Sequence, residues 1–160
     1  MDRKAHLMPE ITLKPITNEN LRPVIKLKVA DDQNNFVAPN VQSIAQVYVN
    51  PTWQPLAMYA DADLVGFTLL GRDADTGFDW IIRFMVGTEH QGKGHGKAAL
   101  LAVIHHLKAQ PDNTHILLSY VPGNAIAEGL YRAVGFAPTG EVDEGEIVMQ
   151  LGNEELGMSS

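Results

Sequence analysis

The apolar positions of the chain repeat with two different periods, and the changes between them predict the order of the elements. Residues 11–16 alternate apolar and polar side chains and include a proline, which is typical of a strand at a sheet edge. Three further apolar runs, 56–60, 64–70 and 79–86, follow one another with short polar turns between them. Strands spaced in this way pair with their neighbours, so the middle of the chain is predicted to be an antiparallel meander.

The rest of the chain mixes helices with two more strands. Helical patterning predicts four helices, over about residues 19–29, 41–49, 97–109 and 125–134. Thr17 or Asn18 is the predicted N-cap of the first helix. Apolar runs on either side of the last helix predict strands over 115–121 and 146–151.

Helices interleaved with one sheet predict an α/β domain of the α+β type, with a central mixed, mostly antiparallel sheet flanked by helices. A chain of 160 residues is long enough for one core of this kind and short for two, so residues 1–160 are interpreted as a single domain. Residues 1–10 and 152–160 lack such patterning and are expected to be flexible ends.

Composition narrows the classes of function. A net charge of −7 argues against a nucleic-acid surface, which requires a basic stripe. No apolar run is long enough to span a bilayer, so we expect a cytoplasmic protein without membrane or nucleic-acid partners. The absence of cysteine excludes disulfides and a thiol nucleophile.

The segment with the strongest chemical signal is Gln91-Gly92-Lys93-Gly94-His95-Gly96-Lys97, which connects the strand at 79–86 to the helix at 97–109. Glycine at every second position removes Cβ atoms and permits positive φ, so that backbone N–H groups can surround an anion. The N-terminus of the following helix adds partial positive charge. The loop is therefore predicted to bind a phosphate-bearing group.

Three other interpretations of this loop are weaker. Residues 87–93 fit the spacing of a Walker A segment, but Gly94 stands where a Ser or Thr must hold magnesium, and the strand at 115–120 lacks a Walker B aspartate. A dinucleotide fingerprint has Gly-x-Gly-x-x-Gly near the start of a βαβ unit, whereas these glycines alternate past the middle of the chain. A flexible turn is the simplest alternative.

Two motifs in this order resemble the GNAT superfamily of N-acetyltransferases, which use acetyl-coenzyme A. The loop at 91–97 is similar to the Gln/Arg-Gly-x-Gly-x-Gly/Ala motif of that family, and 124–136 resembles a second motif with Asn, a Tyr seven residues later and then Gly-Phe. The resemblance covers residues 11–151. A narrower similarity, over 83–85, 118–120 and 139–146, is to the bacterial spermine/spermidine acetyltransferases.

The resemblance implies a GNAT-like domain and a role for each motif. The loop amides would hold the pyrophosphate of coenzyme A, the preceding strand would lie along the pantetheine, and Tyr131 would give a proton to the departing thiolate. Asn124 would contact the pantetheine and also cap its helix. The implied cofactor-binding residues are Phe84, Met85, Val86, Gln91, Gly92, Lys93, Gly94, His95, Gly96, Lys97 and Asn124.

The acceptor implied by the narrower similarity is a small-molecule amine, a polyamine such as spermidine or spermine, and its predicted contacts are Gln33, Phe36, Glu141 and Asp143. Alternatives are a peptide N-terminus, a lysine, an aminoglycoside, or a non-catalytic module that binds coenzyme A.

The resemblance does not identify the general base, because Ile82 and Arg83 stand where related enzymes often carry a carboxylate. Asp79, Glu141, Asp143 and Glu146 are the remaining candidates. The histidines lack ligand spacing, so no metal is expected. Many family members pair as dimers, so the resemblance allows a homodimer.

Overall fold

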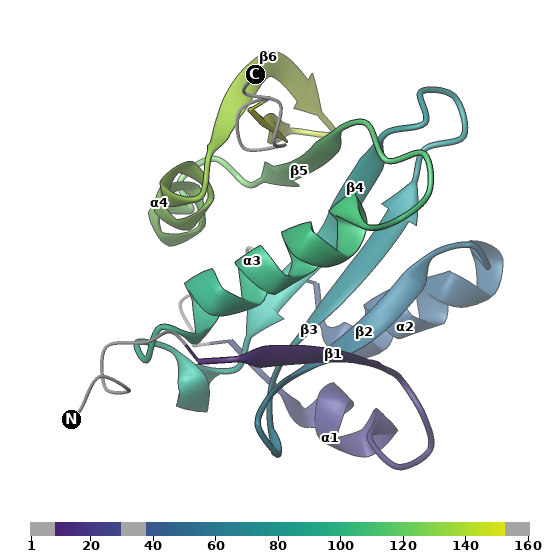
Figure 1. Cartoon of the computed structure of the whole chain (residues 1–160), viewed down its shortest axis with the longest axis vertical. Helices are drawn as coiled ribbons and strands as arrows, with labels where there is room; N and C mark the ends of the chain where they lie inside the picture. Colours follow the sequence, from purple (N-terminus) through teal and green to yellow (C-terminus); the bar gives the residue numbers. More distant parts are fainter. Residues whose placement is uncertain (1–8, 30–37, 153–160) are drawn as a thin grey trace.

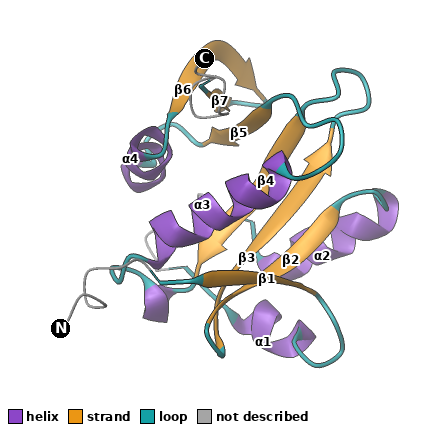
Figure 2. Cartoon of the chain, in the orientation of Figure 1, coloured by secondary structure: helices purple, strands orange, loops and turns teal. Residues whose placement is uncertain are grey.

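The computed structural model describes residues 9–29 and 38–152 and contains a seven-stranded sheet in the order β1-β2-β3-β4-β5-β7-β6 (Figures 1 and 2). Every neighbouring pair is antiparallel except β4 and β5, which are parallel. The predicted mixed, mostly antiparallel sheet and its central meander are therefore confirmed. The strands are β1 Ile11–Pro15, β2 Gln54–Ala60, β3 Asp63–Arg72, β4 Asp79–Val86, β5 Ile116–Tyr120, β6 Phe136–Asp143 and β7 Glu146–Leu151.

Helices cover both faces of the sheet. Figure 1 shows α3 crossing in front of the strands, with α1 and α2 behind them and α4 beside β5 and β6. In the described part of the chain, no helix is long and apolar enough to cross a membrane. The helices are α1 Leu21–Lys26, α2 Asn40–Val49, α3 His95–Lys108 and α4 Ala125–Ala133, and a short 3-10 helix, η3, spans Thr88–His90.

Because side chains alternate between the two faces of the sheet, the hydrophobic core consists of two clusters, one on each face. Met58 of β2 packs into the cluster that contains Leu100 of α3, whereas the adjacent Ala57 packs into the cluster that contains Val24 of α1. Successive side chains of a strand point to opposite faces, so one sheet serves both cores.

The strands β4 and β5 pair over only two positions. Asp79 lies opposite Ile116 and Trp80 opposite Leu117, and the register ends there. β4 continues alongside β3 while β5 continues alongside β7, so the two central strands separate toward their carboxyl ends. Ile82 has no partner in the register between β3 and β4, which marks a β-bulge in β4.

Three details of the sequence interpretation are wrong. The first helix ends at Lys26 rather than near Val29, because the carbonyl of Lys28 accepts a hydrogen bond from the amide of Thr88 at 2.7 Å in an extended segment. Its N-cap is Asn20, which replaces the predicted Thr17 or Asn18. Strand β6 was not predicted at all.

Candidate active site

The separation of β4 and β5 opens a cavity of about 660 Å³ that reaches from the sheet to the glycine loop. It is lined on one side by the end of β4 and on the other by the end of β5 and by α4. We call it the inner cavity. Tyr131 and seven of the predicted cofactor-binding residues line it, namely Phe84, Met85, Val86, Gln91, Gly92, Gly96 and Asn124.

The remaining predicted loop residues lie outside the lining of this cavity, around the N-terminus of α3. Gly94 is the N-cap of α3 with φ 82°, and its lack of a side chain leaves the first N–H groups of the helix without a side-chain cap. His95 is held by a contact of its Nδ1 with the carbonyl of His90 at 3.1 Å. Lys93 and Lys97 are exposed.

The inner cavity has the features that a coenzyme A thioester requires. Gly92 and Gly94 both have positive φ, and a Cβ at Gly92 would meet open space, so the loop amides face an accessible surface. The edge of β4 beyond Trp80 has no strand partner on the β5 side among the described residues, so an extended, amide-bearing arm can pair with it. The glycine loop therefore fits a pyrophosphate, and the strand edge fits the pantetheine that is joined to it.

Asn124 and Tyr131 occupy the β5 side of this cavity, on α4. The Oδ1 of Asn124 accepts a hydrogen bond from the amide of Ala127 at 3.2 Å, which confirms its predicted role as the N-cap. Tyr131 is 8% exposed and has edge contacts with the rings of Tyr120 and Phe136. Burial, followed by the negative charge of Glu146, raises the pKa of Tyr131 to about 12.

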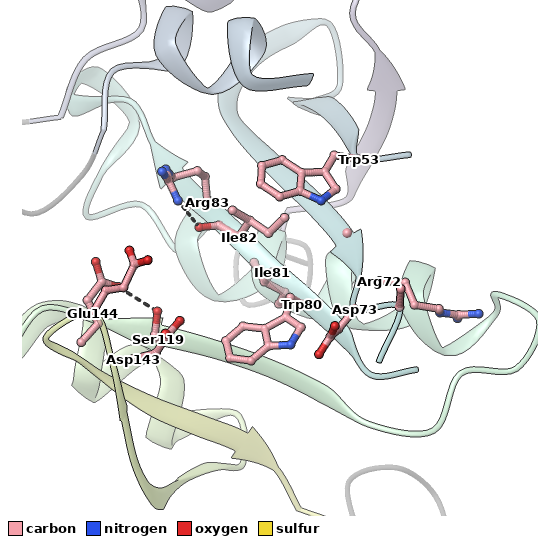
Figure 3. Close-up of a pocket in the computed structure, with 13 residues that line it drawn as sticks. Trp53, Arg72, Asp73, Trp80, Ile81, Ile82, Arg83, Ser119, Asp143 and Glu144 are labelled. Atoms are coloured by element: carbon pink, nitrogen blue, oxygen red, sulfur yellow. Dashed lines mark hydrogen bonds between the residues drawn. The ribbon is translucent and has the colours of Figure 1, made fainter. Parts of the chain in front are cut away.

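A second cavity of about 480 Å³, which we call the outer cavity, lies beside the bulged part of β4. In Figure 3, Arg72 and Asp73 lie at one end of it and Asp143, Glu144 and Ser119 at the other. The indoles of Trp53 and Trp80 contribute aromatic surface from different elements. Its acidic lining residues are Asp73, Asp143, Glu144 and Glu146.

The two cavities meet at Ile82, Arg83, Ser119 and Glu146, which line both. The hydroxyl of Ser119 on β5 donates a hydrogen bond to Oε1 of Glu146 on β7 at 2.7 Å. The Nη1 of Arg83 donates to the carbonyl of Ile82 at 2.9 Å, and its buried Nε has no partner among the described residues. Two molecules bound in the two cavities would therefore face each other across this junction.

The predicted acceptor contacts are only partly brought to the outer cavity. Asp143 lines it, whereas Glu141 is exposed on β6 and lines neither cavity. Gln33 and Phe36 lie outside the described residues, although the flanking Val29 and Ala38 line the inner cavity.

Sequence reasoning missed Trp53, Trp80 and Ser119 as lining residues, because they come from three separate segments that only the folded sheet brings together. It also retained Asp79 as a base candidate. Asp79 is 4% exposed, and its carboxylate is bonded by Arg72 and Asn113 rather than facing a cavity, so that assignment is wrong.

Within residues 9–29 and 38–152, no group of three His, Cys, Asp or Glu side chains is placed to hold a metal ion.

The family model described as Acetyltransferase (GNAT) family matches residues 38–136, a span that contains the glycine loop, α4 and all lining residues of the inner cavity except Val29 and Glu146. The chain belongs to this family and is an N-acetyltransferase. Membership confirms the predicted family and the predicted enzyme class.

Named relatives and solved structures are similar to the chain over most of its length. The chain is 32% identical over 146 residues to the spermine/spermidine N(1)-acetyltransferase of Bacillus subtilis (strain 168), an alignment that covers 87% of this chain and 96% of the relative. The spermidine N-acetyltransferase from Vibrio cholerae, solved with CoA and spermine, has a TM-score of 0.70 at 17% identity and covers 88% of this chain and 93% of its own. The aminoglycoside acetyltransferase AAC(6')-Ib with coenzyme A has a TM-score of 0.77 at 19% identity, covering 94% and 99%. These likenesses confirm the predicted fold.

Proposed function

We propose that this enzyme transfers the acetyl group of acetyl-coenzyme A directly to a primary amine of a polyamine such as spermidine or spermine. The observation that carries the proposal is the junction of the two cavities. The inner cavity fits the donor, the outer cavity has an acidic and aromatic lining, and Ile82, Arg83, Ser119 and Glu146 are common to both. The name of the Bacillus subtilis relative supports a polyamine acceptor.

The donor supplies an acetyl thioester, and the chain binds and orients it. We assign the amides from Gly92 to Lys97 to the pyrophosphate and the free edge of Phe84, Met85 and Val86 to the pantetheine. Lys93 and Lys97 are exposed beside the loop and contribute positive charge toward the same polyanion. The Nε2 of Gln91 donates to the carbonyl of Val86 at 2.9 Å, which ties the start of the loop to the strand.

Tyr131 is the proposed proton donor to the departing sulfur. With a pKa raised to about 12, its phenol stays protonated throughout the neutral range. An ordinary thiol has a pKa of about 8.5, so a thiolate is less basic than the Tyr131 phenolate and Tyr131 does not ionise before the reaction. The hydrogen bond from the Tyr131 hydroxyl to the sulfur instead strengthens as negative charge develops on the sulfur, and the proton is transferred as the carbon–sulfur bond breaks.

The outer cavity favours a polycation over a simple amine. Asp143 and Glu144 stand at one end of it, and carboxylates attract ammonium groups without needing a fixed geometry. The indole faces of Trp53 and Trp80 offer cation–π contacts to a second ammonium group or to the methylene chain between them. Asp73 also lines the cavity, but its carboxylate already accepts from Asp75 and Thr76 in the β3–β4 turn.

A second candidate acceptor is an amine that also carries a carboxylate, such as a free amino acid. The observation that favours it is Arg83, a cationic residue that lines both cavities at their junction. A guanidinium binds a carboxylate in a paired geometry that an ammonium cannot share. The positive charge of Arg83 would therefore attract the carboxylate of an amino acid, whereas it would repel the ammonium groups of a polyamine.

Matched amines separate these candidates. Free-thiol release with acetyl-coenzyme A is measured for putrescine and ornithine, which differ by one carboxylate, and for spermidine, butylamine, a lysine peptide and an aminoglycoside. A polyamine enzyme has a kcat/KM for spermidine at least tenfold above that for butylamine, and a higher value for putrescine than for ornithine. A preference for ornithine identifies the second candidate.

Calorimetric titration with coenzyme A, read together with thiol release, identifies a non-catalytic binding module, which would bind coenzyme A but release no thiol from acetyl-coenzyme A. The cytoplasmic location and the homodimer stay predictions.

A further inference from the structure

The acceptor must lose a proton before it can react. An alkyl amine has a pKa of about 10 and is almost entirely protonated at pH 7, and an ammonium group has no electron pair with which to attack a thioester. The strand that precedes the glycine loop carries Ile82 and Arg83 rather than a carboxylate at the positions facing the junction. A carboxylate that accepts this proton must therefore come from another strand.

Glu146 is the carboxylate that the fold brings to the junction. It begins β7, and because β7 lies between β5 and β6 in the sheet, its side chain reaches the space between β4 and β5. Among the acidic residues that line the outer cavity, Glu146 is the one that also lines the inner cavity. It is half-buried, whereas Asp143 and Glu144 are exposed.

We propose that Glu146 is the proton acceptor for the acceptor amine and that Ser119 positions it. This inference rests on the proposed function. The hydroxyl of Ser119 occupies one side of the carboxylate, at Oε1, which fixes its rotamer while Oε2 is left to face the amine. Ser119 lines both cavities with it, so the pair forms one wall of the junction.

Other groups around Glu146 are consistent with this role. Tyr131 of α4 lies close enough for the charge of Glu146 to contribute to its raised pKa, which places the proton acceptor and the proposed proton donor on the same site. Arg83 of β4 is the cationic group at the junction, and Tyr120 of β5 lines the inner cavity. The neighbouring acids are Asp143 at the end of β6 and Glu144 in the β6–β7 turn.

The protons balance as follows. The ammonium nitrogen gives one proton to the carboxylate of Glu146 and becomes a neutral amine. Its electron pair then forms a bond to the acetyl carbon, the carbon–sulfur bond breaks, and the sulfur takes a proton from Tyr131. The second proton that the nitrogen loses restores Tyr131, and Glu146 releases its proton to water. The products are an N-acetylated amine, a free thiol and one proton in solution.

Glu146→Gln keeps the side-chain size and can still accept from Ser119, but it cannot take up a proton. We expect kcat/KM for spermidine at pH 7 to fall about a hundredfold, the lower range for loss of a general base. Because the variant uses only amine that is already neutral, its rate rises about tenfold for each pH unit from 7 to 9. The parent profile is flatter, so the deficit narrows as the pH rises.

The control is Asp63→Asn, which makes the same change of charge at an exposed position that lines neither cavity. Glu144→Gln provides a comparison within the outer cavity, where loss of a binding charge raises the KM for spermidine. Calorimetric affinity for coenzyme A and the unfolding temperature of Glu146→Gln should match those of the parent. Ser119→Ala should reduce kcat less than Glu146→Gln does.

Parallel pH profiles for the parent and Glu146→Gln would overturn the assignment, since they show that another group or solvent accepts the proton. Loss of coenzyme A affinity together with kcat would also overturn it, by showing a structural role. A parent protein that releases no thiol with any amine contradicts the proposed function itself. An active parent with parallel profiles contradicts this inference alone.

Discussion

The carboxylate of Asp79 accepts a pair of hydrogen bonds from the guanidinium of Arg72, Nε to Oδ1 at 2.8 Å and Nη2 to Oδ2 at 3.0 Å. This pair lies where β4 and β5 begin to run together, and Asn113 donates a third bond to Oδ2 at 2.6 Å. The Arg72–Asp79 pair therefore holds β4 and β5 together where they pair, and the inner cavity lies toward the other end, where the two strands separate.

Removal of this carboxylate should destabilise the fold. We expect Asp79→Ala to lower the free energy of unfolding by about 2–3 kcal/mol, because it leaves charged donors without their acceptor. Urea unfolding measures the change, with Asp63→Asn as an exposed control. A loss within about 0.5 kcal/mol, the range of ordinary surface substitutions, would show that the pair does not hold the two strands together.

Tyr131→Phe tests the proposed proton donor. The ring contacts with Tyr120 and Phe136 are retained, so the variant should fold and bind coenzyme A with nearly unchanged affinity. Loss of the hydroxyl should lower kcat at least tenfold, as expected for general acid catalysis. Steady-state kinetics and calorimetry measure the two quantities, and equal turnover in variant and parent would refute the role.

The same residue predicts how stability depends on alkaline pH. The pKa of Tyr131 is raised in the folded state from 10.0 to about 12, so its contribution to stability is complete below pH 10 and is lost as the pH rises toward 12. The unfolding temperature of the parent should therefore fall more steeply above pH 10 than that of Tyr131→Phe. Tyr48→Phe, at an exposed position, is the control and should follow the parent. Identical slopes for parent and Tyr131→Phe contradict the buried, protonated phenol.

Gly71 provides a test of the outer cavity. A Cβ at Gly71 would lie 2.7 Å from Cδ1 of the Trp53 indole and 2.8 Å from Cδ1 of Ile82, so alanine displaces the indole. We expect Gly71→Ala to raise the KM for spermidine severalfold while the affinity for coenzyme A is kept. Gly129→Ala is the matched control, since its Cβ meets nothing within 4 Å on helix α4. An unchanged KM would show that Trp53 does not contact the acceptor.

The glycine loop is tested by two glycines in the same conformation. Gly94 has φ 82° at the N-cap of α3, and Gly77 has φ 78° in the β3–β4 turn. Alanine at either position incurs a similar backbone strain of about 1–2 kcal/mol. Gly94→Ala alone should weaken coenzyme A binding, by about tenfold or more, when the two variants are titrated in parallel. Equal affinities would remove the loop from the donor site.

The donor side of the site could be predicted from the sequence because its signals are local. The spacing of Gly92, Gly94 and Gly96 specifies a loop conformation, and Asn124 and Tyr131 stand on one short helix, so neighbours along the chain are also neighbours in space. The strands of the meander follow from their own apolar runs.

The acceptor side could be predicted only in part: Asp143 and Glu146 are candidates from the sequence, but only the fold places them at the outer cavity. Strand β6 exposes all its residues except Phe136, so it has no alternation to detect, and Pro138 and Gly140 argue against a strand. Its hairpin turn, with Glu144 at φ 49° and Gly145 at φ 83°, uses a less typical residue pair than Asn-Gly. Glu146 reaches the junction only because β7 inserts between β5 and β6, an order set by tertiary packing.

The central claim, acetyl transfer from acetyl-coenzyme A to a polyamine, is tested most directly by measuring free thiol and N-acetylspermidine in the same reaction. The account predicts that both products form in equal amounts and that neither forms when spermidine is omitted. Thiol release that does not depend on the amine, or binding of coenzyme A without any acetylated polyamine, would contradict it.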